Sequence, residues 1–513
     1  MGMLAAMPPT TSPTPANGDG APVRDRADAC PGALRLHPAD DGRLARLRLP
    51  AGILTYRQAR LLATVAERLG DGHLDITSRG NIQLRGLGES CGAELADLLH
   101  GAGLLPSEAH ERVRNIVASP LAGLDGTVQR PGADVQVWAR RLDELLCASA
   151  AATALSGRFL FALDDGGGDM AGLGADVMLL AQGTRDAQRT QGTQGTQGDR
   201  GTQDARGAQG ADADTAVLYI GTNRPERTAS GPLFTAFQVA AADAPKAALI
   251  AAETFLTVAA ATGPGAWRVR ELPPGHGLGE AVAAGLAEAG IAAEPTSPPP
   301  DLPEAGPPPP GPVTAGDGTT ALSVYAPLGR LTAGQWRLLT TGGGSGELRV
   351  TPWRGVIVPG LDPAGADVSL DRLRAAGLIT TAAAPSYGVS ACTGRPGCAK
   401  ALTDVRSDAA AAIRAMAATR AAATGAVPDT TTTGSVPDTT GTDAVPGARP
   451  VHWSGCARRC GRPAGGPGGG HVDVVATADD SYEISVRGRL LTTAAGPELA
   501  AAVATARTTT VTR

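Results

Sequence analysis

Two stretches of the chain repeat the same order of hydrophobic and polar positions. Hydrophobic residues alternate with polar ones in residues 44–49 and 322–325, which is the period of a half-buried strand. A helix is expected to begin after Thr55 in the first stretch and after Thr332 in the second, because threonine is a favoured helix N-cap. A second strand is expected over 75–84 and 348–358. The order strand, helix, strand predicts a compact α+β unit that occurs twice.

The two units also share individual residues. At an offset of 277, seven of thirteen positions are identical, namely Pro50, Gly52, Leu54, Thr55, Gln58, Leu61 and Leu62, which recur as Pro327, Gly329, Leu331, Thr332, Gln335, Leu338 and Leu339. At an offset of 275, the segment Arg79-Gly80-Asn81-Ile82 is matched by Arg354-Gly355-Val356-Ile357. We therefore predict a pseudo-duplication, in which one copy can cover the sheet edge that the other leaves open.

Segments of low complexity separate these units from the rest of the chain. Residues 182–214 repeat Gly-Thr-Gln, residues 295–317 are rich in proline, and residues 424–449 repeat Val-Pro-Asp-Thr-Thr. Because none offers an apolar face to bury, we predict disorder at 1–30, 182–214 and 424–449 and an extended linker at 295–317. The predicted domains are a first half-domain at 31–105, an α/β domain at 106–294, a second half-domain at 318–380 and a last α/β domain at 381–513.

Composition narrows the class of protein. The 45 basic and 50 acidic residues give a net charge of −5, which argues against a surface that binds nucleic acid or anionic lipid. The longest apolar run, residues 247–263, contains Glu253 and is expected to be a helix of a soluble protein. Residues 1–28 lack the basic start and apolar run of a secretory signal, so we expect a cytoplasmic protein.

Four of the seven cysteines form two closely spaced pairs. Five residues separate Cys392 from Cys398, and three separate Cys456 from Cys460. Four thiolates can surround a 4Fe-4S cluster, and glycines beside them let the backbone bend around it. A structural zinc site and ordinary buried cysteines remain alternatives at this point. The remaining three, Cys30, Cys91 and Cys147, have no partner at ligand spacing and receive no function.

These motifs together resemble the nitrite and sulfite reductase family. The resemblance lies in the two cysteine pairs, the repeated unit and the segment Thr-Ser-Arg-Gly-Asn-Ile-Gln-Leu at 77–84. The segments at 159–166, 351–354 and 391–398 are most similar to the precorrin-3B synthase branch of that family. The resemblance implies a pseudo-duplicated fold with two ferredoxin-like half-domains and two larger α/β regions, and a 4Fe-4S cluster on the four paired cysteines.

The resemblance also implies a tetrapyrrole site formed by basic residues. Arg79, Arg114 and Arg158 match anion-binding positions of the family, and Arg354 stands in the repeated block. Guanidinium groups bind carboxylates through two parallel hydrogen bonds, and a precorrin carries several carboxylates. Leu160 stands where the reductases place a second lysine, which removes one anchor for sirohaem.

For this branch the implied reaction is the oxygen-dependent hydroxylation of precorrin-3A with closure of a lactone, in aerobic cobalamin biosynthesis. Because the chain has no Gly-x-Gly-x-x-Gly motif after a strand, we expect an external electron donor, either a reduced carrier or an NADH-linked reductase. Oxygen activation is then assigned to a mononuclear non-haem iron. Asp164, Asp165 and His452 are candidates for iron ligation or proton transfer, although two adjacent acids often only shape a turn.

Two other functions fit the same motifs. The first is a sirohaem-dependent sulfite or nitrite reductase, in which Cys460 would bridge the cluster and the sirohaem. The second is a non-catalytic tetrapyrrole carrier with a structural zinc. Leu160 and the segments at 159–166 and 351–354 favour the synthase. We expect a monomer under each of these readings.

Overall fold

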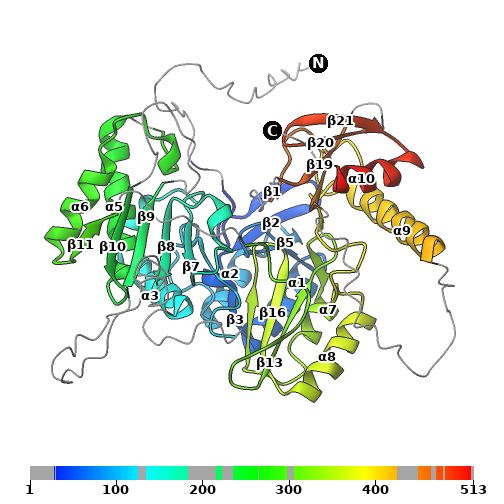
Figure 1. Cartoon of the computed structure of the whole chain (residues 1–513), viewed down its shortest axis with the longest axis horizontal. Coiled ribbons are helices and arrows are strands. Elements are labelled where there is room, and N and C mark those ends of the chain that lie inside the picture. Colours follow the sequence, from blue (N-terminus) through cyan, green and yellow to red (C-terminus); the bar gives the residue numbers. More distant parts are fainter. Residues whose placement is uncertain are drawn as a thin grey trace, which may run out of the picture.

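The computed structural model describes residues 28, 30–124, 134–182, 215–221, 235–263, 265–296, 305–424, 449–463, 470–477 and 480–509 (Figure 1). The segments predicted to be disordered, 1–30, 182–214 and 424–449, lie almost entirely outside the described residues. The two half-domains lie in the middle of the molecule, with one further sheet on either side of them (Figure 1).

Each half-domain contains a five-stranded sheet, and each sheet takes one edge strand from the other repeat. The first sheet has the order β1 (His37–Ala39), β2 (Gly42–Leu47), β5 (Ile82–Leu87), β4 (His73–Ile76), β14 (Arg330–Thr332). The second has the order β12 (Gly311–Thr314), β13 (Thr320–Tyr325), β16 (Gly355–Leu361), β15 (Glu347–Val350), β3 (Ile53–Thr55). Strand β14 pairs with β4, and β3 pairs with β15. This reciprocal exchange confirms the predicted duplication and covers an edge of each sheet.

The helices that follow the exchanged strands begin in the same way. Helix α1 (Tyr56–Leu69) starts at a capping box of Thr55 and Gln58, and α7 (Ala333–Leu338) at one of Thr332 and Gln335. The two helices pack together, and the Trp336 indole donates a hydrogen bond of 2.9 Å to the carbonyl of Ala59. Two further helices, α2 (Gly92–Gly101) and α8 (Pro363–Ala375), complete the half-domains. One continuous core therefore serves both repeats.

The turn between the paired strands corrects the second sequence match. Ile76 pairs with Ile82 across the first turn and Val350 with Val356 across the second, so equivalent residues are 274 positions apart. Arg354 is therefore equivalent to Gly80, not to Arg79 as the offset of 275 had aligned it. The offset of 277 for the earlier block agrees with the structure, because β3 and β14, with their helices, occupy equivalent places.

A six-stranded sheet follows the first half-domain. Its order is β11 (Ala293–Pro295), β10 (Thr235–Ala240), β9 (Thr215–Ile220), β8 (Val177–Gln182), β7 (Phe161–Asp164), β6 (Ile116–Ala118). Helices α3 (Val135–Ala148), α5 (Ala244–Thr262) and α6 (Leu278–Glu288) pack against it. Helix α5 is long and apolar enough to cross a membrane, but its alanine-rich face is buried in this core and Glu253 accepts a hydrogen bond from Ser149. It is a core helix, as expected from the sequence.

The last region is a five-stranded sheet with the order β17 (Val389–Ala391), β18 (Val451–Ser454), β19 (Val472–Ala476), β20 (Tyr482–Val486), β21 (Arg489–Ala494). Strands β17, β18 and β19 are parallel, and α9 (Val405–Thr424) and α10 (Glu498–Thr508) pack on the sheet. The predicted linker at 295–317 is shorter than expected, because Gly311–Thr314 forms β12. The described residues also form four 3-10 helices: η1 (Pro50–Gly52), η2 (Ala151–Ala154), η3 (Ala171–Leu173) and η4 (Val269–Glu271).

Candidate functional site

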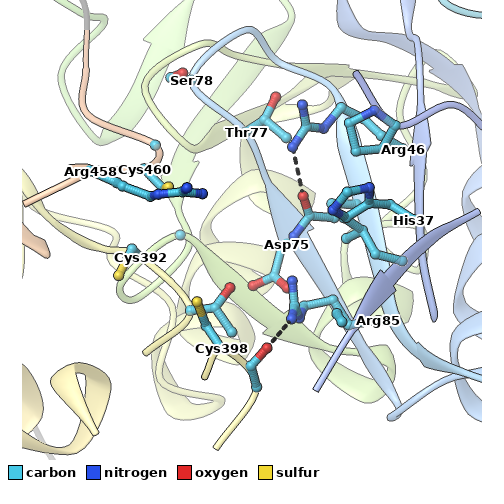
Figure 2. A pocket seen from close by; sticks show the side chains of 18 of the residues that line it. His37, Arg46, Asp75, Thr77, Ser78, Arg85, Cys392, Cys398, Arg458 and Cys460 are labelled. Atoms are coloured by element: carbon cyan, nitrogen blue, oxygen red, sulfur yellow. Dashed lines mark hydrogen bonds between the residues drawn. The ribbon is translucent and has the colours of Figure 1, made fainter. Parts of the chain in front are cut away.

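A cavity of about 1010 Å³ lies where the two half-domains meet the cysteine-bearing loops. Its walls come from the first sheet, from the turn at Thr77–Asn81, from Gly329 and Arg354 of the second repeat, and from the loops after β17 and β18. Figure 2 shows thiols on one side of this space and the arginines of the first sheet on the other. The volume lies at the upper end of the usual range for small-molecule sites, about 300–1,000 Å³.

The alternation of side chains along two strands makes one wall of the cavity basic. Ala45 and Leu47 of β2 face the core, while Arg46 and, beyond the strand end, Arg48 line the cavity. In the same way, Gln83 and Arg85 of β5 line it while their neighbours are buried in the core. Because successive side chains of a strand point to opposite faces, the pattern that buries the core also presents the arginines to the cavity.

Arg46, Arg48, Arg79 and Arg354 are among the cavity cations that have no carboxylate within ion-pair distance in the described part of the chain. Arg46 donates to the side chain of Gln83 and Arg48 to the carbonyl of Arg112. Arg79 donates to the carbonyls of Gly157 and Arg158, and Arg354 to that of Gly461. Burial lowers the pKa of Arg48 to about 9 and that of Arg79 and Arg354 to about 10. Buried cations without counter-ions favour an anionic ligand.

Other arginines of the cavity are paired and hold its walls together. Arg85 binds both carboxylate oxygens of Asp41 at 2.8 Å and also donates to the carbonyl of Gly397, which precedes Cys398. Arg268 is paired with Asp176 at 2.5 Å. Arg406, which follows the first cysteine pair, binds Asp75 of the first sheet at 2.7 Å. The Arg85–Gly397 hydrogen bond and the Arg406–Asp75 ion pair therefore fix the cysteine-bearing region against the first half-domain.

The structure brings three of the four predicted substrate-binding arginines into the cavity. Arg79, Arg158 and Arg354 line it, and Arg158 lies over the ring of Trp267 at 4.9 Å. Arg114 does not line it. Its guanidinium is 5% exposed and binds both oxygens of Asp143 on α3 at 2.6 Å, so it joins α3 to the loop before β6. A guanidinium whose charge is already compensated in this way is a structural group.

The thiols of both cysteine pairs line one end of the cavity. Cys392 follows β17, Cys398 lies in the next loop, and Cys456 and Cys460 follow β18. Burial raises the pKa of the Cys460 thiol. The charges of the other three cysteines raise this pKa further, because all four thiols lie at the same end of the cavity. The amide of Gly455 donates a hydrogen bond of 3.2 Å to Sγ of Cys392. Hydrogen bonds to ligand sulfurs are one of the ways in which proteins tune iron–sulfur clusters.

Glycines close this end of the cavity where a side chain would not fit. Gly394 has a φ of +71°, and a Cβ there would lie 2.7 Å from Cγ1 of Val405. A Cβ on Gly455 would lie 2.7 Å from Cβ of Ala401. Four convergent thiols, a donor to one sulfur and tightly folded loops fit a 4Fe-4S cluster, which Cys392, Cys398, Cys456 and Cys460 would hold.

The acidic catalytic candidates lie away from the cavity. The carboxylate of Asp164 accepts hydrogen bonds from the amides of Gly166, Gly168 and Met170, so it shapes a turn at the end of β7. Arg158, which lines the cavity, lies six residues before Asp164. The two residues are therefore about 20 Å apart along an extended chain. Asp164, Asp165 and Asp169 form the one group of three metal-ligand residues found among the described residues.

The histidine candidate lies behind the cysteine loop. His452 is fully buried and contacts Oγ of Ser390 at 2.9 Å and the carbonyl of Cys460 at 3.0 Å. Burial, together with the charge of Arg354, lowers the pKa of His452 to about 3, so the ring is neutral. All seven histidines are described, and of these His37 alone lines the cavity. Asp40, Asp75 and Glu271 also line the cavity, but they are not part of a group of three metal-ligand residues in the described part of the chain. The described donors therefore do not fit a mononuclear iron beside the cavity.

Sequence reasoning missed several cavity residues, chiefly Arg46, Arg48, Arg85, Arg268, Lys400 and Arg406. A signal was present for Arg46 and Arg48, because they occupy alternate positions of the strand predicted at 44–49, whose other positions are apolar. Arg85 lies just beyond the strand predicted at 75–84. Arg268 and Lys400 lie outside the strands and α-helices and Arg406 at the start of α9, and no periodic pattern marks them.

Comparisons with known proteins agree with this fold and site. Residues 37–101 match the family described as the nitrite/sulfite reductase ferredoxin-like half domain. The structure of the NirA protein of Mycobacterium tuberculosis superposes with a TM-score of 0.63, covering 90% of this chain and 79% of that chain at 16% identity, which shows the same fold. The chain thus resembles the nitrite/sulfite reductase half domain by sequence over residues 37–101 and the NirA protein by fold over most of its length.

Two curated relatives make the resemblance more specific. A precorrin-3B synthase of Sinorhizobium sp. is 35% identical over 179 residues, which is 34% of this chain and 37% of that protein. A ferredoxin–nitrite reductase of Synechococcus elongatus is 46% identical over 91 residues, or 17% of this chain and 18% of that protein. The similarity thus spans less than two fifths of either relative. Both are oxidoreductases, and the resemblance to precorrin-3B synthase extends over about a third of the chain.

Proposed function

We propose that the protein is a precorrin-3B synthase-like oxidoreductase that binds a polycarboxylate tetrapyrrole next to a 4Fe-4S cluster. The observation that carries the proposal is the set of four unpaired arginines in a cavity that ends at four thiols. A tetrapyrrole with several carboxylates would supply the missing negative charge. The sequence similarity to precorrin-3B synthase favours precorrin-3A as this ligand.

The proposed reaction inserts one atom of O2 into precorrin-3A. The other atom is released as water, with two electrons from an external donor and two protons from the solvent. An acetate side chain of the product then closes a lactone. A bound cluster would supply single-electron transfer from that donor to the cavity. The arginines bind and orient the carboxylates. The Arg85–Gly397 hydrogen bond and the Arg406–Asp75 ion pair keep the cysteine loops at a fixed distance from the basic wall. We propose that the enzyme acts in the cytoplasm as a monomer.

A sirohaem-dependent nitrite or sulfite reductase is the second candidate. It is favoured by the half-domain match and by the nitrite reductase relative. Sirohaem is also a polycarboxylate tetrapyrrole, so the same arginines would bind it. Leu160, however, is buried in a small apolar cluster with Ala162 and Met178 and does not line the cavity. Position 160, at which the reductases carry a further lysine, therefore supplies no anchor for sirohaem.

The decisive experiment is the content of iron, acid-labile sulfide and zinc in anaerobically purified protein, with absorption spectra before and after adding precorrin-3A and O2. Iron and sulfide in equal amounts, no haem band, and an oxygen-dependent product would support the synthase. An intrinsic sirohaem band would favour the reductase, and zinc without sulfide would contradict both.

The variant Cys398→Ser tests the ligand set. We expect it to lose the cluster and activity together, because one of four thiolates is removed. Cys91→Ser is the matched control, since Cys91 is buried at the start of α2 and does not line the cavity. A full complement of iron and sulfide in Cys398→Ser would show that the ligands are assigned wrongly.

A further inference from the structure

Arg354 has a backbone conformation that favours glycine. Its φ is +66°, the same value as that of Gly80, the equivalent residue of the first repeat. Both residues donate their amide to the carbonyl of a threonine three residues earlier, so the two turns are built alike. A non-glycine residue in this region costs about 1–2 kcal/mol, and such strain is concentrated at functional sites. The second repeat therefore carries an arginine at a position where glycine would adopt the backbone conformation without strain.

The structure also makes room for this side chain. A Cβ on Gly329 would lie 2.4 Å from Cδ of Arg354, so any larger residue there would block its path. The guanidinium is 6% exposed, lines the cavity, and donates to the carbonyl of Gly461. Gly461 follows Cys460 directly, and its own φ is +77°. Arg354 thus connects the cavity to the backbone beside a cluster ligand.

We propose that Arg354 is a positioning residue that couples anion binding in the cavity to the environment of the cysteine loop. The inference rests on the proposed function, because it needs both the cluster and an anionic tetrapyrrole. One part of the fork holds the carbonyl of Gly461, while the remaining N–H groups are available to a ligand carboxylate. A carboxylate that binds these N–H groups also neutralises the positive charge that faces the carbonyl of Gly461.

The sign of the coupling follows from electrostatics. Reduction adds a negative charge at the thiolate end of the cavity, and a carboxylate bound to Arg354 opposes that addition. The ligand therefore binds less tightly to the reduced protein, and by linkage it makes the protein harder to reduce. A tenfold difference in affinity between the two states corresponds to a fall of 59 mV in the midpoint potential of a one-electron couple.

The test is a redox titration followed by electron paramagnetic resonance, with and without saturating uroporphyrin, an octacarboxylate macrocycle. In the wild-type protein we expect at least a tenfold difference in affinity between the oxidised and reduced states. Arg354→Gly should reduce this difference to less than twofold and lower the potential of the ligand-free protein. Glycine adopts the left-handed backbone without strain, so this variant should fold and hold its cluster. Arg354→Lys, which keeps the charge but not the fork, should keep part of the difference.

Arg79→Gln is the matched control, because Arg79 lies in the equivalent turn and lines the cavity but donates to Gly157 and Arg158 instead of the cysteine loop. It should bind uroporphyrin more weakly and still show the full shift at saturation. An equal shift in wild type and Arg354→Gly, or none in wild type that holds both cluster and uroporphyrin, would overturn the coupling alone. Absence of the cluster, or of uroporphyrin binding to wild type, would overturn the proposed function and the coupling with it.

Discussion

Replacing a buried, unpaired arginine of the cavity should stabilise the ligand-free protein. Arg48 is 4% exposed, and its pKa is lowered to about 9, first through burial and then through Arg46 and Arg79. At 1.36 kcal/mol for each pH unit, the charged form is destabilised by about 5 kcal/mol, which is an upper bound. Because the pKa is lowered on folding, this penalty is fully present below pH 9 and disappears only as the pH approaches the ordinary pKa of arginine.

The variant Arg48→Met removes the charge and keeps most of the volume. The loss of the hydrogen bonds from Arg48 costs little free energy. The carbonyls of Arg112 and Gly157 that accept them also accept hydrogen bonds from Nδ2 of Asn115, at 3.1 and 2.9 Å. Two lost hydrogen bonds at about 1 kcal/mol each leave a net stabilisation of about 3 kcal/mol. We therefore expect the melting temperature of the ligand-free protein to rise by about 3 °C, equally at pH 6 and pH 8.

The same variant should weaken ligand binding. Loss of one charge-assisted hydrogen bond, about 1.5–3 kcal/mol, lowers the affinity for uroporphyrin roughly ten- to hundredfold, measured by fluorescence titration. Arg85→Met is the matched control. Arg85 lies on the same wall but is paired with Asp41, so its removal should destabilise the protein by about 3–5 kcal/mol. Equal destabilisation by the two variants would refute the view that the cavity stores uncompensated positive charge.

Two further predictions concern the scaffold. Gly52→Ala should destabilise the protein by more than about 1 kcal/mol in thermal denaturation, because its Cβ would lie 1.9 Å from the carbonyl of Val350. Gly72→Ala, with a φ of +78° and no atom within 4 Å, should cost only the backbone strain, and similar losses in both would contradict the clash. Burial, with Asp164 nearby, raises the pKa of Asp169 to about 8, so its carboxyl costs stability as the pH rises from about 4 to above 8. Asp169→Asn should therefore raise the melting temperature more at pH 8.5 than at pH 5, and a constant difference would disprove this.

The repeated units were predictable because local patterns determine them. The alternation at 44–49, the threonine N-caps and the shared residues at an offset of 277 are each visible in the sequence, and each has its expected place in the structure. The sequence predicted that one copy can cover the open sheet edge of the other. It did not predict that β3 and β14 do so, since sequence alone does not give strand pairing between distant segments. Similarly, β12 was missed because its proline and glycine content is typical of a linker.

The site was less predictable than the fold, because charge compensation depends on tertiary contacts. Arg114 and Arg79 look alike in the sequence, yet Asp143 neutralises the first while the second has only carbonyl partners. Asp164 was a reasonable candidate by residue type, but backbone amides occupy its carboxylate. Alternate arginines on a strand, such as Arg46 and Arg48, are a detectable signal for a basic wall once the opposite face is assigned to the core.

The duplication places two equivalent turns of different sequence on one scaffold. Each repeat completes the sheet of the other, so neither can shift without disturbing the shared core, and the basic wall and the turn that bears Arg354 remain in fixed relation. On this common frame the equivalent turns have diverged. The first keeps Gly80 and directs Arg79 to the loop before β7, whereas the second places Arg354 at the glycine position and directs it to the cysteine loop. In the proposed function both Arg79 and Arg354 bind the anionic macrocycle, and Arg354 also contacts the loop of the cluster ligands.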